Sequence, residues 1–525
     1  MPLTKWWTAA RELPGAPRTR GLGVTAQAWS QCAGDVAASG GRLLAMWASS
    51  CNEWDGAATT TLEIEDVCGD APGQQATGDA SSCATEVYAA FLTASGVLVL
   101  ELPVQGSGAP PAERTDYPAI EALFPCASRM QRAMFDISGV RSSDPDRRPW
   151  LRHPPEGHEL VRVSGEGVHE IAVGPVHAGT IEPGHFRFSV VGEKVLRLEE
   201  RLGYTHKGIE RRFAELPLLE GHRLAARIAG DSAVAHSWAY CQALEGMAGC
   251  VVPPRAAALR ALFLELERIA NHLGDVGALA NDAGFAFGLS QFSRIKEELL
   301  RTISQAFGQR YLLDAVVPGG TQMDVSAETS ESLVARITSV ERQTAELRAI
   351  YEDHSGMRDR FTGAGILTPQ LALRLGVLGL AGRASGQALD ARVDFPIAPY
   401  DEIVPAKVVR EAGDVAARVA ARFEEIGESC RIAKTLLSSL PPGAHRAPVQ
   451  APSAGAFATG LIEGWRGPVF VAIEAGPDGA IHRCHPHDPS WQNWPALEHA
   501  ILGNIVADFP LINKSFNLAY SGVDL

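Results

Sequence analysis

Residues 252–275 read VPPRAAALRALFLELERIANHLGD and are the clearest fold signal in the chain. Pro253 and Pro254 stand where a helix tolerates proline, because the first helical amides have no intrahelical partner. The apolar residues that follow recur with the 3.6-residue period of one helix face. They are Leu259, Leu262, Phe263, Leu266, Ile269 and Leu273. The stretch therefore predicts a long helix whose apolar stripe faces a core.

Similar patterns predict further helices over residues 326–352 and 406–440, the second ended by Pro441 and Pro442. A short strand region is expected from Val161 to about Leu198. Near the other end, GPVFVAIEAGPDGAIHRC (467–484) is typical of strands, and a final helix is expected at about 495–505.

The first 150 residues have a different pattern. GRLLAMWAS (41–49), TTTLEIEDVC (59–68) and EVYAAFLTASGVLVLELPV (86–104) carry β-branched and aromatic residues between Gly- and Ser-rich breaks, as strands do. DPDRRPWLRHPPEG (144–157) is a Pro- and charge-rich linker. We predict an α+β protein with a small α+β domain at 1–150. A mainly helical domain follows at 158–525, with small β regions near its two ends.

Composition excludes several classes of function. The chain has 525 residues, of which 46% are hydrophobic, and its net charge is −14. This charge disfavours nucleic acid or an anionic lipid surface as a direct partner. Nine cysteines without a CxxC pair suit a reducing cytoplasm and predict neither a zinc ribbon nor an iron–sulfur ligand set. Neither a secretory signal nor a run long enough to span a bilayer is apparent, so we expect membrane association only through partner subunits.

Two polar clusters favour structural explanations. Glu265, Arg268 and His272 share one flank of the predicted helix, which favours a buried ion-pair and hydrogen-bond set. HRCHPHD (482–488) brings a cysteine and three histidines together, but its spacing fits no standard zinc template.

Several ordered motifs resemble a known family. They are GPVHAGTIEPGHFRFSVVGEKVLRLEERLGYTHKGIERRF (174–213), ERIANHL (267–273) and NWPALEHAILGN (493–504). Together they resemble the large subunit of complex-I-related, group 4 [NiFe] hydrogenases and the quinone-cavity subunit of respiratory complex I. YPAIEALFPCASRMQRAMFDISGV (117–140) resembles the small peripheral complex I subunit, which precedes the large subunit in formate-hydrogenlyase-type enzymes.

The resemblance implies four metal-binding cysteines, and this chain has none of them. The family's first pair aligns within RIAGDSAVAHSWAY (227–240) and its last pair within SFNLAYSGVDL (515–525). The four positions hold Ala229, Ser232, Ala519 and Gly522. Ala and Gly have no donor atom, and a serine hydroxyl is a hard, normally protonated oxygen. We therefore expect no nickel, no other metal, and a space open to a ligand or to water.

His177 and His185 are the candidate catalytic residues. From the residues alone, two histidines in a Gly- and Pro-rich turn favour an ordinary surface loop. The resemblance implies a loop that enters the quinone cavity, where imidazole can bond a carbonyl and donate a proton. This chain has seven residues between the two histidines where complex I has three. Glu182 beside them is either a proton relay or a solvated carboxylate.

Asp231, Ser232 and His236 are the other candidate binding residues, since they surround the first vacant pair. Complex I holds the quinone head group from this side with a tyrosine, and the matching position here is Gly230 or Ala229. A two-point clamp like that of complex I is therefore in doubt. Asp231 is either a ligand-facing group or a solvated or capping residue.

The resemblance implies an oxidoreductase subunit of a complex-I-like assembly at the cytoplasmic face of the cell membrane. An iron–sulfur small subunit carrying a [4Fe-4S] cluster would pass electrons to a quinone-like carrier in a cavity of this chain, which holds no cofactor itself. Antiporter-like membrane subunits would couple the reaction to ion movement, and NADH-dehydrogenase-like NAD chemistry is implied at complex level. The alternatives are an active [NiFe] hydrogenase and a non-catalytic scaffold. Apolar Phe516, Leu518, Tyr520 and Val523 predict a buried C-terminal tail.

Overall fold

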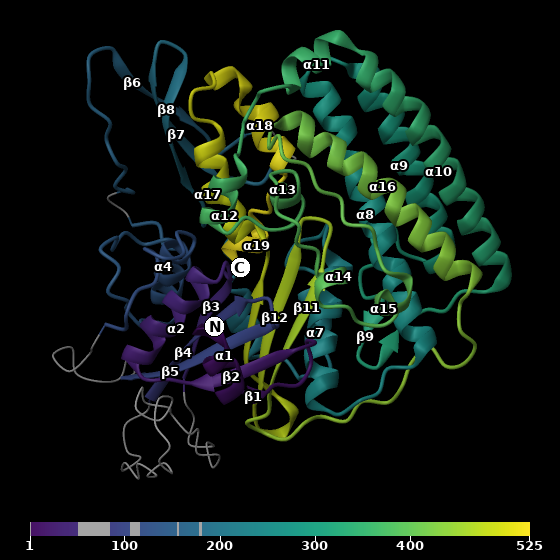
Figure 1. Cartoon of the computed structure of the whole chain (residues 1–525). Coiled ribbons are helices and arrows are strands. Elements are labelled where there is room, and N and C mark those ends of the chain that lie inside the picture. The colour runs from purple at the N-terminus through teal and green to yellow at the C-terminus, as the bar shows by residue number, and fades with distance from the viewer. Residues whose placement is uncertain (1, 51–83, 106–115, 155–156, 178–180) are drawn as a thin grey trace.

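The computed structural model describes residues 2–50, 84–105, 116–154, 157–177 and 181–525. Figure 1 shows an N-terminal α+β part, a group of long helices, and the C-terminal segments running between them. The mixture of helices and strands agrees with the predicted α+β class. The strand expected at 59–68 lies outside the described residues. The boundary expected between residues 150 and 158 stays a prediction.

The N-terminal part is built on a five-stranded sheet in the order β1-β2-β5-β4-β3. Two of the sequence predictions are confirmed here, because 41–49 forms β3 and 86–104 forms the hairpin β4–β5. The strands are β1 Arg11–Glu12, β2 Thr19–Gly23, β3 Arg42–Ser50, β4 Ala84–Leu92 and β5 Val97–Gln105, and the helices are α1 Pro2–Ala9, α2 Ala26–Ala38 and α4 Ala127–Ser138. The α2 helix contacts β5 and α4 contacts β3.

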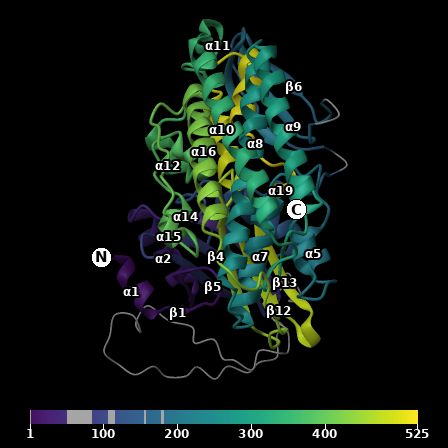
Figure 2. The same ribbon diagram turned by 90° about the vertical axis from the view of Figure 1, so that its right-hand side faces the viewer.

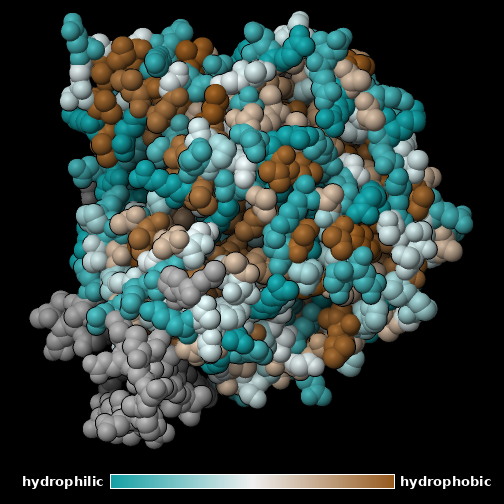
Figure 3. Space-filling view, viewed as in Figure 1, coloured by the Kyte–Doolittle hydropathy of each residue, from teal (hydrophilic) through white to brown (hydrophobic). Residues whose placement is uncertain are grey.

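A second, antiparallel sheet stands apart at the upper left of Figure 1. It consists of β6 (Val168–Val173), β7 (His185–Val191) and β8 (Lys194–Arg201). This confirms the predicted strand region. Hydrophobic side chains gather on this part of the surface in Figure 3, where Val191 and Leu196 are exposed.

Four long helices lie side by side in Figures 1 and 2: α8 (Pro254–Asp282), α9 (Ala286–Phe307), α10 (Ala327–Asp353) and α16 (Val415–Ser438). The predictions at 252–275 and 326–352 are confirmed. The prediction at 406–440 began too early. Gly413 has φ +65°, and the Asp414 carboxylate caps the helix by accepting the Ala417 amide at 2.8 Å.

The third sheet, β11 (Phe457–Glu463), β12 (Pro468–Ala475) and β13 (Ile481–His487), packs between α7 (Ala233–Met247) and β3. The α7 backbone approaches so closely that a Cβ on Gly460 would lie 1.9 Å from the Ala239 carbonyl oxygen. The final helix predicted at 495–505 is wrong in its bounds. α17 runs over Ser490–Ala500, directly after Pro489, and two shorter helices follow it.

Shorter elements connect these layers. They are α5 Ile209–Phe213, α6 Gly221–Ala225, β9 Val316–Val317, β10 Gly320–Thr321, α11 Ser355–Phe361, α12 Pro369–Leu375, α13 Gly379–Arg383, α14 Ala391–Asp394, α15 Tyr400–Ile403, α18 Phe509–Phe516 and α19 Ser521–Asp524, with 3₁₀ turns at Pro477–Gly479 and Val506–Asp508. Within the described ranges, none of the helices combines the length and the apolar character needed to cross a bilayer.

Charged side chains fill part of the core of the helical region. Glu265, Arg268 and His272 are completely buried on α8, as the structural interpretation of this trio predicts. The guanidinium of Arg268 lies 3.6 Å from Glu265, and His272 Nε2 lies 3.1 Å from the carboxylate of Glu425 on α16. Glu425 also binds Arg383 of α13 at 2.8 Å. The trio thus joins α8 to α16 through Glu425.

Candidate functional site

The first vacant pair, Ala229 and Ser232, lies in a turn rather than in a helix. The sequence predicts a helix from Gly221, but α6 ends at Ala225 and α7 begins only at Ala233. The Ser232 amide donates to the Ala229 carbonyl at 2.9 Å and closes the turn. Both side chains are buried. The backbone therefore holds these two positions together although they bind no metal.

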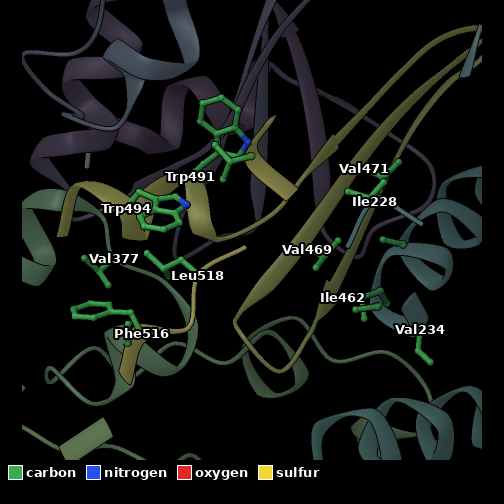
Figure 4. Close-up of a cluster of buried hydrophobic side chains, with 14 of the residues drawn as sticks. Ile228, Val234, Val377, Ile462, Val469, Val471, Trp491, Trp494, Phe516 and Leu518 are labelled. Atoms are coloured by element: carbon green, nitrogen blue, oxygen red, sulfur yellow. The ribbon is translucent and has the colours of Figure 1, made fainter. Parts of the chain in front are cut away.

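The second pair, Ala519 and Gly522, lies in the C-terminal tail. The tail is buried, as predicted, because Phe516, Leu518 and Tyr520 are at most 7% exposed. The Ala519 amide donates to the Ser490 hydroxyl at 2.9 Å, and its carbonyl accepts from Trp494 Nε1 at 3.1 Å. Figure 4 shows Leu518 beside Trp494, with Phe516 nearby.

The last two residues of the sequence are held by backbone amides. The amides of Gly203 and Thr205 donate to the Asp524 carboxylate at 2.8 and 2.9 Å. The Leu525 carbonyl oxygen accepts from the amides of Lys207 and Gly208 at 2.8 and 3.2 Å. Amide dipoles thus hold this buried end of the tail.

Asp488 lies against the last vacant position. A Cβ on Gly522 would lie 2.9 Å from Asp488 Cγ, so this carboxylate takes up space that a cysteine side chain would need. Asp488 Oδ2 lies 3.5 Å from His236 Nε2, and both side chains are completely buried or nearly so. Burial opposes ionisation, but His236 and Arg466 outweigh it and lower the pKa of Asp488 to about 2. The Asp488 side chain therefore reduces the open space that was expected at the vacant positions, on the side of Gly522.

Polar atoms of this site have unused hydrogen-bonding capacity. Nδ1 of His236 lacks a hydrogen-bond partner among the described residues, while Nε2 of His236 and Oδ2 of Asp488 form an ion-pair contact at 3.5 Å that does not meet hydrogen-bond geometry. Buried polar atoms in folded proteins are almost always paired, with protein or with water. A polar guest between the vacant positions would satisfy them.

Asp231 forms a two-pronged ion pair with Arg466, which follows β11. The two guanidinium nitrogens lie 2.7 and 2.5 Å from the two carboxylate oxygens. The Ser232 hydroxyl accepts from Trp465 Nε1 at 3.1 Å and from Arg466 at 3.2 Å. Burial lowers the pKa of Arg466, but Asp231 raises it above its usual range, so the site keeps a positive charge. The Asp231 side chain is 40% exposed, which places this end of the site at the surface.

The two loop histidines brace the loop itself. His177 Nε2 donates to the Gly184 carbonyl at 2.9 Å, and His185 Nδ1 donates to the Gly174 carbonyl at 3.2 Å. The second nitrogen of His185 accepts from Arg187 Nε at 3.4 Å. In this geometry neither neutral ring offers a further N–H to a ligand, because His177 donates its one N–H to Gly184 and His185 donates its one N–H to Gly174. The structure thus gives both residues a local structural task.

Glu182 connects this loop with the tail. Its carboxylate accepts from the amides of Tyr520 and Ser521, both at 3.2 Å, at the start of α19. A Cβ on the nearby Gly184 would lie 2.6 Å from the Tyr520 ring. The structure therefore joins the His177–His185 loop to the vacant position at Gly522 through the tail.

Sequence reasoning missed two residues of this site, Arg466 and Asp488. Asp488 stands in HRCHPHD, where the histidines drew attention as metal ligands. In the structure His485 binds Glu210 at 2.5 Å and His487 binds Gln492 at 3.1 Å, so both belong to the packing around β13. A lone arginine in the apolar stretch around GWRGPVF was the available signal for Arg466.

The donor set of the site does not fit a [NiFe] centre. Ser232 provides a hydroxyl that Trp465 and Arg466 already occupy, and the other three positions provide no side-chain donor. The described residues contain no cluster of three or more His, Cys, Asp or Glu arranged to hold a metal ion. What the site offers instead is a buried imidazole, a carboxylate and a guanidinium, which suit hydrogen bonding, proton transfer and stabilisation of negative charge.

Glu267 of α8 lies next to this site. Its carboxylate accepts the amides of Val234 and Ala235 at 2.7 and 3.3 Å, at the start of α7. Burial raises the pKa of Glu267 to about 8, although these two amides oppose the shift. A small pocket lined by Gly230, Asp231 and Glu267 leads from this carboxyl to the surface.

Glu267→Gln is expected to change how stability depends on pH. The unfolded chain ionises Glu267 above about pH 4.5 and the folded chain only above about pH 8, so wild-type stability falls across that interval. Glutamine stays neutral, so the variant gains a few kcal/mol relative to wild type between pH 5 and pH 8, at about 1.4 kcal/mol per pKa unit. Melting temperatures at both pH values measure this, with exposed Glu346→Gln as control. If the melting temperatures of Glu267→Gln and of wild type changed by the same amount between pH 5 and pH 8, the prediction would be wrong.

Comparisons with known proteins give the chain its relatives. Residues 282–454 match the family described as respiratory-chain NADH dehydrogenase, 49 Kd subunit. Formate hydrogenlyase subunit 5 of Escherichia coli (strain K12) is 31% identical over 443 residues, which cover 79% of this chain and 78% of that protein. The carbon monoxide-induced hydrogenase of Rhodospirillum rubrum is 30% identical over 348 residues, covering 66% and 96%.

A solved structure shows the same fold. The membrane-bound sulfane sulfur reductase, described as an archaeal respiratory membrane complex, has a chain that superposes with a TM-score of 0.64 at 24% identity. The match covers 69% of this chain and 99% of that one.

Proposed function

Because this chain belongs to the family of the respiratory NADH dehydrogenase 49 Kd subunit and of related hydrogenase subunits, we propose that it is the acceptor-binding redox subunit of such a complex. An iron–sulfur partner delivers electrons to a quinone or similar carrier bound between the vacant positions. Membrane subunits couple the reaction to ion movement, and they hold this chain at the cytoplasmic face of the membrane.

The observation that carries this proposal is the buried pair His236 and Asp488. Asp488 lies against the position of Gly522, one of the four positions where the family has a metal ligand, and Nδ1 of His236 has no hydrogen-bond partner among the described residues. A carrier that takes up two electrons must also take up two protons, and an imidazole backed by a carboxylate can pass protons to its oxygens. The Arg466 guanidinium stabilises the negative charge that the carrier gains with the electrons.

The partly exposed position of Asp231 supports the entry of electrons at the end of the site beside the Ala229–Ser232 turn. Its carboxylate is partly exposed while its partner Arg466 is buried, so the site reaches the surface beside the Ala229–Ser232 turn. We place the iron–sulfur partner there. We still propose that His177 and His185 contact the carrier. Glu182 connects their loop to the C-terminal tail, which carries the vacant position at Gly522. Among the described residues, hydrogen bonds occupy both ring nitrogens of His185 and Nε2 of His177.

We expect His236→Gln to lower turnover about 100-fold or more, the usual value of a positioned proton donor. Carrier binding should weaken only modestly, because one hydrogen bond contributes about 1 kcal/mol net. Turnover and carrier binding are measured separately in assembled complexes, with His177→Ala and His185→Ala alongside and exposed His169→Gln as control. Wild-type turnover in the first three variants would show that these histidines are structural.

Two alternatives give different results in the same preparations. An active [NiFe] hydrogenase would contain one nickel per chain and take up hydrogen. A non-catalytic scaffold would show no carrier turnover in the wild-type complex. The scaffold is the second candidate, because the Asp231–Arg466 ion pair and the contact of Asp488 with the position of Gly522 fill part of the site. We expect iron from the partner subunits and no stoichiometric nickel.

A further inference from the structure

A second cavity lies where α4 meets β8 and α17. Its volume is about 210 Å³, and we call it the junction cavity. Four arginines line it, Arg129, Arg132, Arg148 and Arg197, together with Trp150 and Glu200. This volume is below that of a typical drug-sized pocket and suits a small ligand.

Arginines and carboxyl groups line the junction cavity together. Arg129 binds the carboxylates of Glu200 and Glu498 at 3.1 and 2.7 Å. Burial, and then the neighbouring Glu498, raise the pKa of Glu200 well above its usual range. Among the lining residues, four guanidinium groups face three carboxyl groups, those of Glu199, Glu200 and Glu498.

Asp146 lies 3.2 Å from Arg132 and 2.8 Å from Arg148, so both of these arginines have a close carboxylate. Burial lowers the pKa of His158 to about 4, so this lining residue is neutral at pH 7.

Four of the lining side chains also have polar atoms without a hydrogen-bond partner among the described residues. They are Trp150 Nε1, Arg197 Nε, His158 Nδ1 and Glu200 Oε1. Trp150 and Glu200 are each only 2% exposed. The indole and guanidinium nitrogens can only donate. Trp150 and Arg197 therefore present donors that have no acceptor among the described residues.

We propose that the junction cavity binds a small oxyanion, of the phosphate type. An oxyanion offers several acceptor oxygens to the unpartnered donors of Trp150 and Arg197. Arg197 is the residue best placed to bind it. Its nearest carboxylate, Glu199, lies 4.0 Å away, whereas the other three guanidinium groups have close partners. The ligand would join the N-terminal part of the chain to β8 and α17.

Calorimetric titration of the full chain with inorganic phosphate tests this, with chloride keeping the ionic strength constant. We expect saturable binding that Arg197→Gln weakens at least tenfold. Trp150→Phe, which keeps the ring and loses its donor, should also weaken binding. Arg342→Gln is the matched control, because Arg342 is exposed on α10 and pairs only with Glu346. Glycerol phosphate in a parallel titration distinguishes a phosphorylated metabolite from free phosphate, according to which binds more tightly.

Absence of saturable binding of both compounds would overturn the proposal, and would mean that water alone satisfies the cavity. Equal affinity of wild type and Arg197→Gln would also overturn it, since binding would then lie elsewhere. Circular dichroism and melting temperature of each variant establish that it is folded before its titration is interpreted.

Discussion

Deletion of residues 515–525 is expected to prevent the chain from folding stably or from assembling. The segment buries Phe516, Leu518, Tyr520, Val523 and Leu525. At roughly 1.5–3 kcal/mol for each large buried side chain, the loss is on the order of 10 kcal/mol, comparable to the whole stability of a typical domain. The measurement is soluble yield, melting temperature and co-purification with partner subunits.

A point substitution in the same segment separates packing from polar contacts. Asp524→Ala keeps the apolar tail but leaves the amides of Gly203 and Thr205, and the Thr205 hydroxyl, without their acceptor. We expect a destabilisation of about 1–3 kcal/mol for the unpaired buried groups. Asp401→Ala on exposed α15 is the control. For the deletion of residues 515–525, a product that is fully soluble and fully assembled would show that the tail is dispensable.

Glu425→Ala is expected to destabilise the protein by about 3–5 kcal/mol, the usual cost of removing one partner from a buried ion pair. Glu425 is the central carboxylate of the buried helical core, at 2.6 Å from Arg268 and 2.8 Å from Arg383. Attraction to Arg383 and Arg268 outweighs burial and lowers its pKa well below the usual range, so it is ionised in the folded protein. Its removal leaves the buried guanidinium groups of Arg268 and Arg383 with fewer negative charges to balance them.

Thermal unfolding compares this variant with two others. Glu425→Gln keeps the volume and some hydrogen bonds but not the charge, and should lie between wild type and Glu425→Ala. Glu352→Ala removes the partner of Arg348 in an exposed i, i+4 pair on α10, which is worth at most a few tenths of a kcal/mol. Equal melting temperatures for Glu425→Ala and Glu352→Ala would contradict a central role for Glu425.

Local sequence patterns predicted most of the regular elements. The helices over 252–275 and 326–352 and the strands within 41–49 and 86–104 are present, because hydrophobic periodicity is written into neighbouring residues. Helix boundaries were less well predicted. α16 starts at a capping carboxylate, Asp414, and the helix expected from Gly221 breaks before Ala233. Capping and breaking depend on single contacts that periodicity does not contain.

By itself, the sequence determined the family, the absence of all four thiolates, and the burial of the tail, since these follow from residue identity, motif order and apolar composition. Only the tertiary structure decided what surrounds the vacant positions. Asp231 meets Arg466 across 235 residues of chain, and Asp488 meets both His236 and Gly522. Such contacts join elements far apart in the sequence. They form because β11 and β12 pack against α7 and the tail helices pack against α17, which brings charged groups together, and each buried charge needs an opposite charge or a hydrogen bond.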